Sequence, residues 1–102
     1  MKRAWVYILE CADDSYYVGS TTNIHKRIAE HKSGLFGGYT AARKPVIPLW
    51  SQEFDDIRNA IEAERQIKTW TRAKKEALMR GDFKELNLLS RSSATKAKNR
   101  IV

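Results

Sequence analysis

The stretch that decides the fold is RAWVYILECADDSYYVGS, residues 3–20. Residues 3–11 are rich in aromatic and β-branched side chains, which predicts a β-strand. Residues 13–15, Asp-Asp-Ser, are typical of a turn, and residues 16–20 predict a second strand that pairs with the first as a hairpin. Both faces are largely apolar, so we expect a sheet that is covered on both sides. Alternation along the first strand divides its side chains between the two faces, with Trp5, Tyr7 and Leu9 on one and Val6 and Ile8 on the other.

The remainder of the chain predicts helices around one further strand. A helix is expected over residues 23–33 and should end at Gly34, because glycine adopts the left-handed conformation that closes many helices. A glycine-rich loop at 35–40 follows. Residues 46–54 predict a third strand, with Pro48 at a sheet edge or near the strand start, since proline cannot donate a ladder hydrogen bond. Capping residues and helical spacing predict three more helices, over 56–70, 72–80 and 83–89.

Up to the helix over residues 72–80, this order of elements predicts an α+β fold of the type β-β-α-β-α-α. The sheet should be small, three-stranded and mainly antiparallel, with helices flanking it. A chain of 102 residues is long enough for one such domain and too short for two. We therefore expect a domain over residues 1–89, followed by a flexible basic tail over residues 90–102, where apolar residues become rare.

The composition excludes several classes of protein. Hydrophobic residues make up 42% of the chain, which indicates a folded domain, but no apolar run is long enough to span a membrane. The basic start is followed by an apolar stretch that Glu10 and Asp13 interrupt, unlike a signal peptide, so the prediction is a cytoplasmic protein. The one cysteine, Cys11, cannot form an intrachain disulfide and is interpreted as an apolar strand residue.

The charge of the chain favours a polyanionic partner. The formal net charge is +7, and nucleic acid is the simplest partner for such an excess. The alternative is a solvated basic surface. We predict DNA as the partner and a monomer as the oligomeric state, with an oligomer left open. Part of the charge belongs to the tail, which holds four basic residues and leaves +3 on the rest of the chain: Arg91, Lys96, Lys98 and Arg100.

A carboxylate on the apolar side of the helix over 56–70 is the first candidate for chemistry. Glu64 lies midway between Ile61 and Ile67 on the apolar stripe. Glu62 falls on the opposite side of the helix. A carboxylate that faces the core is costly unless a cationic side chain or a metal ion accompanies it. From helical geometry alone, a salt bridge is favoured over a metal ligand, because structural ion pairs are common.

A basic pair on the helix over 23–33 is the second candidate. Arg27 and His31 are spaced i,i+4 on the inner side of that helix and should project together towards the sheet. One reading has Arg27 extending its charge to solvent and His31 partly buried with its hydrogen bonds satisfied. The other reading is a phosphate site, since guanidinium groups bind phosphate oxygens well.

Tyrosines on the paired strands complete the set. Tyr7 lies mid-strand and Tyr17 lies on the paired strand, where Gly19 leaves room beside it for a ligand or a closely packed backbone. Aromatic core packing is the alternative for each tyrosine taken singly. Tyrosines, arginine, histidine and a carboxylate would together suit phosphodiester hydrolysis, with a divalent cation on Glu64 and Arg27 neutralising a phosphate oxygen. A tyrosine is a poor base at neutral pH unless its pKa is depressed.

The order and combination of these motifs resemble the GIY-YIG nuclease superfamily, in its small single-domain bacterial branch. WVY at residues 5–7 and YVG at residues 17–19 are similar to the paired motifs that name the family. Residues 20–31 resemble the segment after the second motif, with its arginine and its following His or Tyr. Residues 60–68 resemble the helix that carries a metal-binding glutamate. The resemblance covers about residues 3–80.

The resemblance implies a metal-dependent DNA endonuclease of low sequence specificity, in DNA repair or processing, that leaves 5′-phosphate and 3′-hydroxyl ends. Tyr7 would be the general base, directly or through water, and Tyr17 would support the water or the phosphate. Arg27 would stabilise the transition state, and His31 would help to bind the phosphate or move protons. Glu64 would be the sole protein ligand of Mg²⁺ or Mn²⁺, cations that keep most of their waters.

Two departures from the family pattern bear on activity. Trp-Val stands in place of the Gly-Ile of the first motif, and Ser20 stands where some members have a lysine after the second. The alternative function is a catalytically weak nucleic-acid-binding module of the same fold. A protein-interaction domain in which these residues are structural is a third reading. The expected DNA contacts, beyond the tail, are Lys26, Lys32, Arg43, Lys44 and Lys68, with Tyr39 stacking on a base.

Overall fold

The computed structural model describes residues 2–90 of the chain. Contacts between residues group the chain into two compact units, Met1–Thr69 and Trp70–Val102, which are described separately below. The first unit holds the sheet, three helices and every residue proposed above for chemistry. The predicted division between a domain over 1–89 and a tail stays a prediction, because the tail from residue 91 onward lies outside the described residues.

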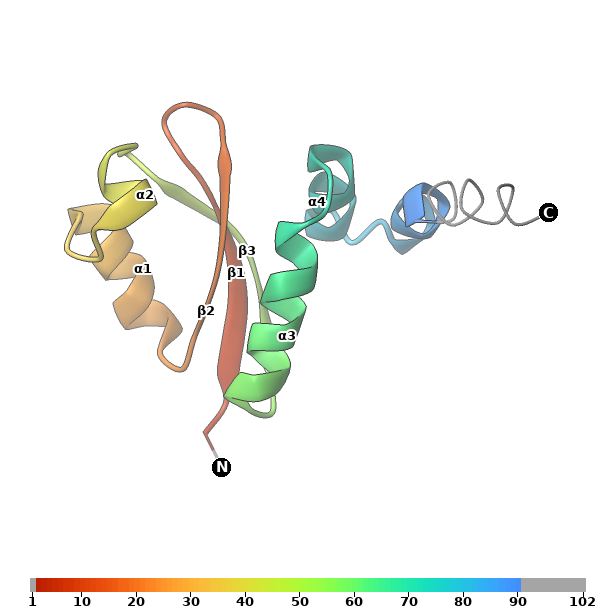
Figure 1. The fold of residues 1–102 in the computed structure, drawn as a ribbon, viewed down its shortest axis with the longest axis horizontal. Helices are drawn as coiled ribbons and strands as arrows, with labels where there is room; N and C mark the ends of the chain where they lie inside the picture. Colours follow the sequence, from red (N-terminus) through yellow and green to blue (C-terminus); the bar gives the residue numbers. More distant parts are fainter. Residues whose placement is uncertain (1, 91–102) are drawn as a thin grey trace. The chain divides into compact units, whose positions relative to one another are not determined.

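The first unit is built on a three-stranded antiparallel sheet (Figure 1). Strand β1 (Ala4–Glu10) lies in the centre, with β2 (Tyr16–Thr21) on one side and β3 (Ile47–Phe54) on the other. The predicted α+β class and the predicted hairpin are therefore confirmed. Central β1 is buried along almost its whole length, as expected of a strand that is apolar on both faces.

The register between β1 and β2 sorts their side chains onto two faces. Tyr7 pairs with Gly19, so those two residues share a face with Leu9 and its partner Tyr17. Ser20 pairs with Val6 and lies on the opposite face. The predicted division of side chains along β1 is therefore correct, and it places the two tyrosines together.

The third strand is an edge strand, which explains how it accommodates a proline. Pro48 is the second residue of β3 and pairs with Leu9, next to an irregularity in the register between Ile8 and Leu9. An edge position spares proline from donating a ladder hydrogen bond, so the predicted placement of Pro48 is confirmed.

Helices cover both faces of the sheet, which is seen edge-on in Figure 1 between α1 and α2 on the left and α3 on the right. Helix α1 (Ile24–Ser33) begins after Asn23, whose side chain accepts a hydrogen bond from the Lys26 amide, and ends at Gly34 in the left-handed conformation. Helix α3 (Ile57–Lys68) begins after Asp56, which accepts from the Asn59 amide. Tyr7, Leu9, Cys11 and Val46 form a buried cluster against which Tyr17, Ile24 and Ile28 pack.

A short helix, α2 (Gly38–Ala41), was not predicted, and the expected loop at 35–40 is wrong in this part. The prediction failed because glycines at positions 34, 37 and 38 are typical of loops. Here they serve turns instead, since all three adopt positive φ angles, and the chain makes one helical turn between α1 and β3. The order of elements is therefore β-β-α-α-β-α-α through α4, rather than β-β-α-β-α-α.

The second unit is helical over its described residues. Helix α4 (Arg72–Met79) begins after Thr71, whose side chain accepts a hydrogen bond from the Lys74 amide. Residues 83–90 are also helical, close to the predicted 83–89. Within residues 2–90 we find no helix with the length and apolar character needed to cross a membrane.

Candidate active site

Three buried polar side chains form a hydrogen-bonded network between β1, α1 and α2. The Tyr7 hydroxyl is 2.8 Å from Nε2 of His31, and Nδ1 of His31 is 2.7 Å from the Thr40 hydroxyl. All three side chains are at most 1% exposed. Strand β1, helix α1 and the short helix α2 each supply one member. The imidazole is thus held at both nitrogens, which fixes its orientation in the core.

Burial keeps the two titratable residues of this network, Tyr7 and His31, neutral near pH 7. Desolvation by burial is the largest influence on Tyr7 and raises the pKa of its phenol, although the nearby Arg27 guanidinium opposes the shift. Desolvation and the charge of Arg27 lower the pKa of His31 to about 4. A neutral imidazole has one donor and one acceptor nitrogen, so one of its two hydrogen bonds is donated and the other is accepted.

The position of the Tyr7 hydroxyl depends on the glycine opposite to it. A Cβ atom at Gly19 would lie 2.4 Å from the Tyr7 oxygen, well inside van der Waals contact. The room that the sequence predicted beside Gly19 is therefore filled by the Tyr7 phenol. Glycine at this place in β2 lets the ring lie flat across the neighbouring strand and reach His31.

Tyr17 lies between this buried network and the charged residues of α3, Glu64 and Lys68. Its ring centroid is 5.1 Å from that of His31 and 6.3 Å from that of Tyr7. Burial raises the pKa of the Tyr17 phenol, while the Lys68 ammonium opposes the shift and the Glu64 carboxylate adds to it. Both α3 charges are therefore close enough to Tyr17 to affect its ionisation.

Ser20 joins the arginine and the glutamate that the sequence singled out. Its backbone carbonyl accepts a hydrogen bond of 3.4 Å from Arg27 Nη1, and its hydroxyl donates to Glu64 Oε1. Arg27 comes from α1 and Glu64 from α3, which lie on opposite faces of the sheet. They meet at Ser20 because β2 is an edge strand, around which both side chains can reach.

The second oxygen of Glu64 forms an ion pair with Lys68, at 2.6 Å from its Nζ atom. The Glu64 side chain is 16% exposed and that of Lys68 is 50% exposed. A salt bridge was the alternative for Glu64 that the sequence favoured, and this pair supplies one. Among residues 2–90 no group of three or more His, Cys, Asp or Glu side chains could hold a metal ion.

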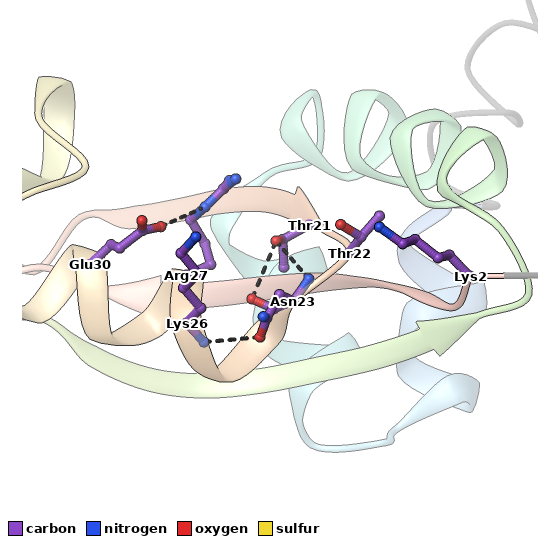
Figure 2. Close-up of a pocket in the computed structure, with 7 residues that line it drawn as sticks. All are labelled: Lys2, Thr21, Thr22, Asn23, Lys26, Arg27 and Glu30. Carbon is purple, nitrogen blue, oxygen red and sulfur yellow. Dashed lines mark hydrogen bonds and ion pairs between the residues drawn. The ribbon is translucent and has the colours of Figure 1, made fainter.

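Arg27 has further partners on α1 and in the loop that follows it. Its Nε atom lies 3.4 Å from Glu30 Oε1, the pair joined by a dashed line in Figure 2. Its guanidinium carbon lies 4.5 Å from the ring centre of Phe36. Phe36 in turn lies 4.3 Å from the His31 ring, centre to centre. The guanidinium is therefore held in one region by several contacts, none of which pairs it with Glu64.

The residues predicted to contact DNA lie in different environments. Lys26 and Lys32 are exposed on α1, and Lys44 Nζ donates a hydrogen bond of 3.4 Å to the Ser33 carbonyl. Lys68 is paired with Glu64, as described above. Arg43 and Tyr39 are engaged with each other, since the Arg43 guanidinium carbon lies 3.7 Å from the ring centre of Tyr39.

The contacts that Tyr39 makes within the protein limit its predicted stacking on a base. Its hydroxyl donates to the Ser15 hydroxyl at 2.7 Å, and Arg43 also forms a 3.0 Å ion pair with Asp13. At least one face of the Tyr39 ring is covered by Arg43, and its plane lies within 28° of that of Tyr17. Stacking on a base stays a prediction, and it would require Arg43 to move or the base to use the remaining ring surface.

Sequence reasoning did not assign Ser20 and Thr40 to the site. Ser20 was noted only as a departure from the family pattern, yet its place in the alternation of β2, next to Gly19, put it on the face that α3 covers. Thr40 carried no such signal, because its burial depends on a helical turn within a glycine-rich segment.

Comparisons with known proteins identify the family of this chain, and the family model spans every residue of this site. The family model described as the GIY-YIG catalytic domain matches residues 3–77. A UPF0213 protein of Natronomonas pharaonis is 44% identical over 75 residues, which is 74% of this chain and 88% of the relative. A UPF0213 protein of Streptococcus pneumoniae is 41% identical over 88 residues, which is 86% of this chain and 88% of the relative. The solution NMR structure of a protein from E. faecalis is similar with a TM-score of 0.56 and 35% identity, covering 81% of this chain and 88% of that chain.

Proposed function

The chain belongs to the GIY-YIG catalytic domain family, and on this basis we propose that it is a metal-dependent DNA endonuclease that hydrolyses phosphodiester bonds with low sequence specificity. The observation that carries the proposal is the bridging position of Ser20. A guanidinium that can neutralise phosphate and a carboxylate that can hold a cation lie on either side of one residue, and Tyr17 lies within electrostatic reach of the carboxylate. Hydrolysis of a phosphodiester needs both kinds of charge at one place.

The buried network of Tyr7, His31 and Thr40 supports a proton pathway. A protonated phenol is a weak base and Tyr7 is fully buried, so this pathway requires water to reach the Tyr7 hydroxyl and Tyr7 to pass its own proton to His31 at the same time. The neutral imidazole can accept this proton through the lone pair of Nε2, although burial lowers the pKa of His31 to about 4 and makes it a weak base, so the transfer is transient. The Nδ1–H bond then points to Thr40, whose hydroxyl accepts it.

Glu64 would hold the cation, Mg²⁺ or Mn²⁺. One carboxylate suits a cation that keeps most of its waters, and such a cation stabilises charge on the phosphoryl group and the leaving oxygen when bound. Lys68 has to leave one Glu64 oxygen for this to happen. Its side chain is half exposed, so the ion pair costs little to break, about 0.5 kcal/mol or less.

Arg27 would neutralise a non-bridging oxygen of the phosphate. Its contacts with Ser20, Glu30 and Phe36 position the guanidinium beside the sheet before any substrate arrives. Preorganised charge of this kind lowers the barrier because little reorganisation is needed during the reaction.

The family resemblance supplies the finer expectations that belong to this proposal. They are cleavage to 5′-phosphate and 3′-hydroxyl ends, a role in DNA repair or processing, a cytoplasmic location and a monomeric state. The rival function is a nucleic-acid-binding module that cuts weakly or not at all. Two observations favour the rival: both Glu64 oxygens are already bonded to protein groups, and burial raises the pKa of both tyrosines.

One assay separates the two functions. Purified wild type, Glu64→Ala and Arg27→Ala are incubated with supercoiled, branched and single-stranded DNA, with EDTA, Mg²⁺ or Mn²⁺. Glu62→Ala is the matched control, because it removes the same carboxylate from an exposed place on the same helix. We expect metal-dependent cutting that falls by about 100-fold or more in Glu64→Ala and Arg27→Ala, and that is retained in Glu62→Ala.

Binding measured in EDTA completes the comparison. Loss of cutting in Glu64→Ala with binding retained supports the metal role of Glu64. Equal nicking by wild type and Glu64→Ala contradicts the nuclease proposal, and binding without nicking by any variant favours the rival.

A further inference from the structure

A pocket with a volume of about 450 Å³ lies where β2 passes into α1 (Figure 2). Three segments form it: the start of the chain before β1, the turn between β2 and α1, and the first turns of α1. Only Arg27 belongs to the candidate catalytic set. In Figure 2 the Lys2 side chain extends towards Thr22, so residues from the two ends of the hairpin meet here. The lining residues are Lys2, Thr21, Thr22, Asn23, Lys26, Arg27 and Glu30.

The charge of this pocket favours an anion. Lys2, Lys26 and Arg27 carry positive charge, and Glu30 is the one lining carboxylate. Glu30 is already paired with Arg27, at 3.4 Å, so the two lysines dominate the remaining charge. Within residues 2–90 neither Lys2 nor Lys26 forms an ion pair, and both are exposed.

The polar groups of the turn divide into structural and available donors. Thr21 holds the turn, because its hydroxyl accepts from the Asn23 amide at 3.1 Å. The Asn23 side-chain oxygen accepts from the Lys26 amide at 3.2 Å. The amide nitrogen of the Asn23 side chain, with its two N–H donors, and the Thr22 hydroxyl are further polar groups of the lining residues. The pocket therefore offers hydroxyl and N–H donors together with ammonium groups, which is the donor set that binds phosphate oxygens.

We propose that this pocket binds a backbone phosphate of the nucleic acid next to the phosphate that is cut. The proposal rests on the proposed function for the location of the second phosphate, since Arg27 lines the pocket on one side and contacts Ser20, the partner of Glu64, on the other. A strand whose scissile phosphate lies at Arg27 and Glu64 would place a neighbouring phosphate between Lys2 and Lys26. Such contacts position the strand and carry no sequence information.

The first test measures DNA binding without cutting. A labelled short DNA duplex is titrated in EDTA at several NaCl concentrations with wild type, with Lys2→Ala/Lys26→Ala, and with Arg58→Ala/Arg65→Ala. The last variant is the matched control, because it also removes two exposed basic side chains, from another hollow on α3. We expect the Lys2/Lys26 variant to bind about 10-fold more weakly at low salt, with the slope of log K against log salt reduced by about 0.9 for the one phosphate that is no longer neutralised.

The outcomes distinguish this proposal from the nuclease proposal. Equal, small losses in both double variants overturn the phosphate pocket, because a general loss of positive charge would then explain them. Cutting with Mg²⁺ is a separate measurement, so a protein that never cuts DNA can still show the Lys2/Lys26 effect. A protein that cuts but shows no such effect retains its activity assignment and loses this pocket.

The second test locates the ligand by NMR. Addition of the unlabelled duplex to the ¹⁵N-labelled protein in EDTA should shift the backbone amide signals of Thr22 and Asn23, and the shifts should shrink in Lys2→Ala/Lys26→Ala. Inorganic phosphate is the second ligand tested, since it shares the chemistry of the backbone. Shifts at these amides with inorganic phosphate but not with the duplex would show a site for free phosphate and overturn the proposal.

Discussion

The two sides of the candidate site differ in how firmly their side chains are held. The buried side consists of Tyr7, His31 and Thr40, at most 1% exposed and joined by hydrogen bonds of 2.8 and 2.7 Å. The charged side consists of Arg27, Glu64 and Lys68, whose side chains are 16–50% exposed and held by ion pairs. Water screens the second set and is excluded from the first.

This difference separates stability from activity. Changes on the buried side leave polar atoms without partners or create clashes in the core, and both effects destabilise the fold. Changes on the charged side remove contacts that water can replace at low cost, so they should affect the chemistry and leave the fold intact. The four predictions below use the free energy of unfolding to test this division.

The largest expected effect is that of Gly19→Ala. The added Cβ would lie 2.4 Å from the Tyr7 hydroxyl in a region where Tyr7 is fully buried, so the ring must shift and break its bond to His31. We expect a loss of about 3 kcal/mol, the upper end of the range for overpacked cores. Thermal unfolding should show a midpoint lowered by roughly 10–20 °C. Ser20→Ala is the neighbouring control and should lose about 1 kcal/mol, and equal losses in both variants would contradict the division.

The second prediction concerns acid. His31 stays neutral in the folded protein down to about pH 4, whereas its ordinary pKa of 6.5 applies when the chain is unfolded. The unfolded state therefore binds more protons as the pH falls, and the stability present above pH 6.5 is lost between pH 6.5 and pH 4. Denaturant unfolding should show His31 contributing a loss of about 2 kcal/mol between pH 7.5 and pH 5.

The pH dependence is tested by its slope rather than by absolute stability. His31→Gln lowers stability by itself but should remove this part of the slope, while His25→Ala, on the exposed side of α1, should keep it. An unchanged slope in His31→Gln would mean that other groups cause the acid sensitivity.

The third prediction concerns Thr40. Thr40→Val keeps the shape of the side chain and removes the hydroxyl, which leaves Nδ1 of a buried histidine without its partner. The expected loss is about 1.5 kcal/mol. Thr40→Ser should restore most of it, because the hydroxyl returns. A pH profile of cutting should also shift in Thr40→Val and recover in Thr40→Ser if Thr40 positions the imidazole, whereas a purely structural threonine would leave the profile unmoved.

The sequence predicted the parts of this site that follow local periodicity. Alternation along the hairpin placed Tyr7 and Tyr17 on one face, and helical spacing selected Glu64 over Glu62. Thr40 was not predictable, because its burial requires a helical turn in a segment whose composition indicates a loop. Partners between distant segments, such as Ser20 with Glu64, depend on how α3 packs on the sheet and are not encoded in any short pattern.

Lys68 is intermediate between the contacts that the sequence predicted and those that it did not. It was assigned to DNA from its charge alone, although it lies four residues after Glu64, the spacing at which a glutamate and a lysine pair on a helix. The pairing was therefore readable from the sequence. What the spacing could not reveal is whether the pair serves the fold or occupies a ligand position.

The smallest expected effect on stability, that of Lys68→Ala, answers this question. The ion pair is half exposed on its lysine side, so its loss should change the free energy of unfolding by no more than about 0.5 kcal/mol. The variant also frees one Glu64 oxygen. Calorimetric titration with Mn²⁺ should therefore show tighter binding than in wild type, and Glu64→Ala should abolish the heat of binding in both backgrounds. Weaker Mn²⁺ binding in Lys68→Ala would show that the lysine supports Glu64 as a ligand instead of competing with the cation, and a large loss of stability would place Lys68 with the buried side.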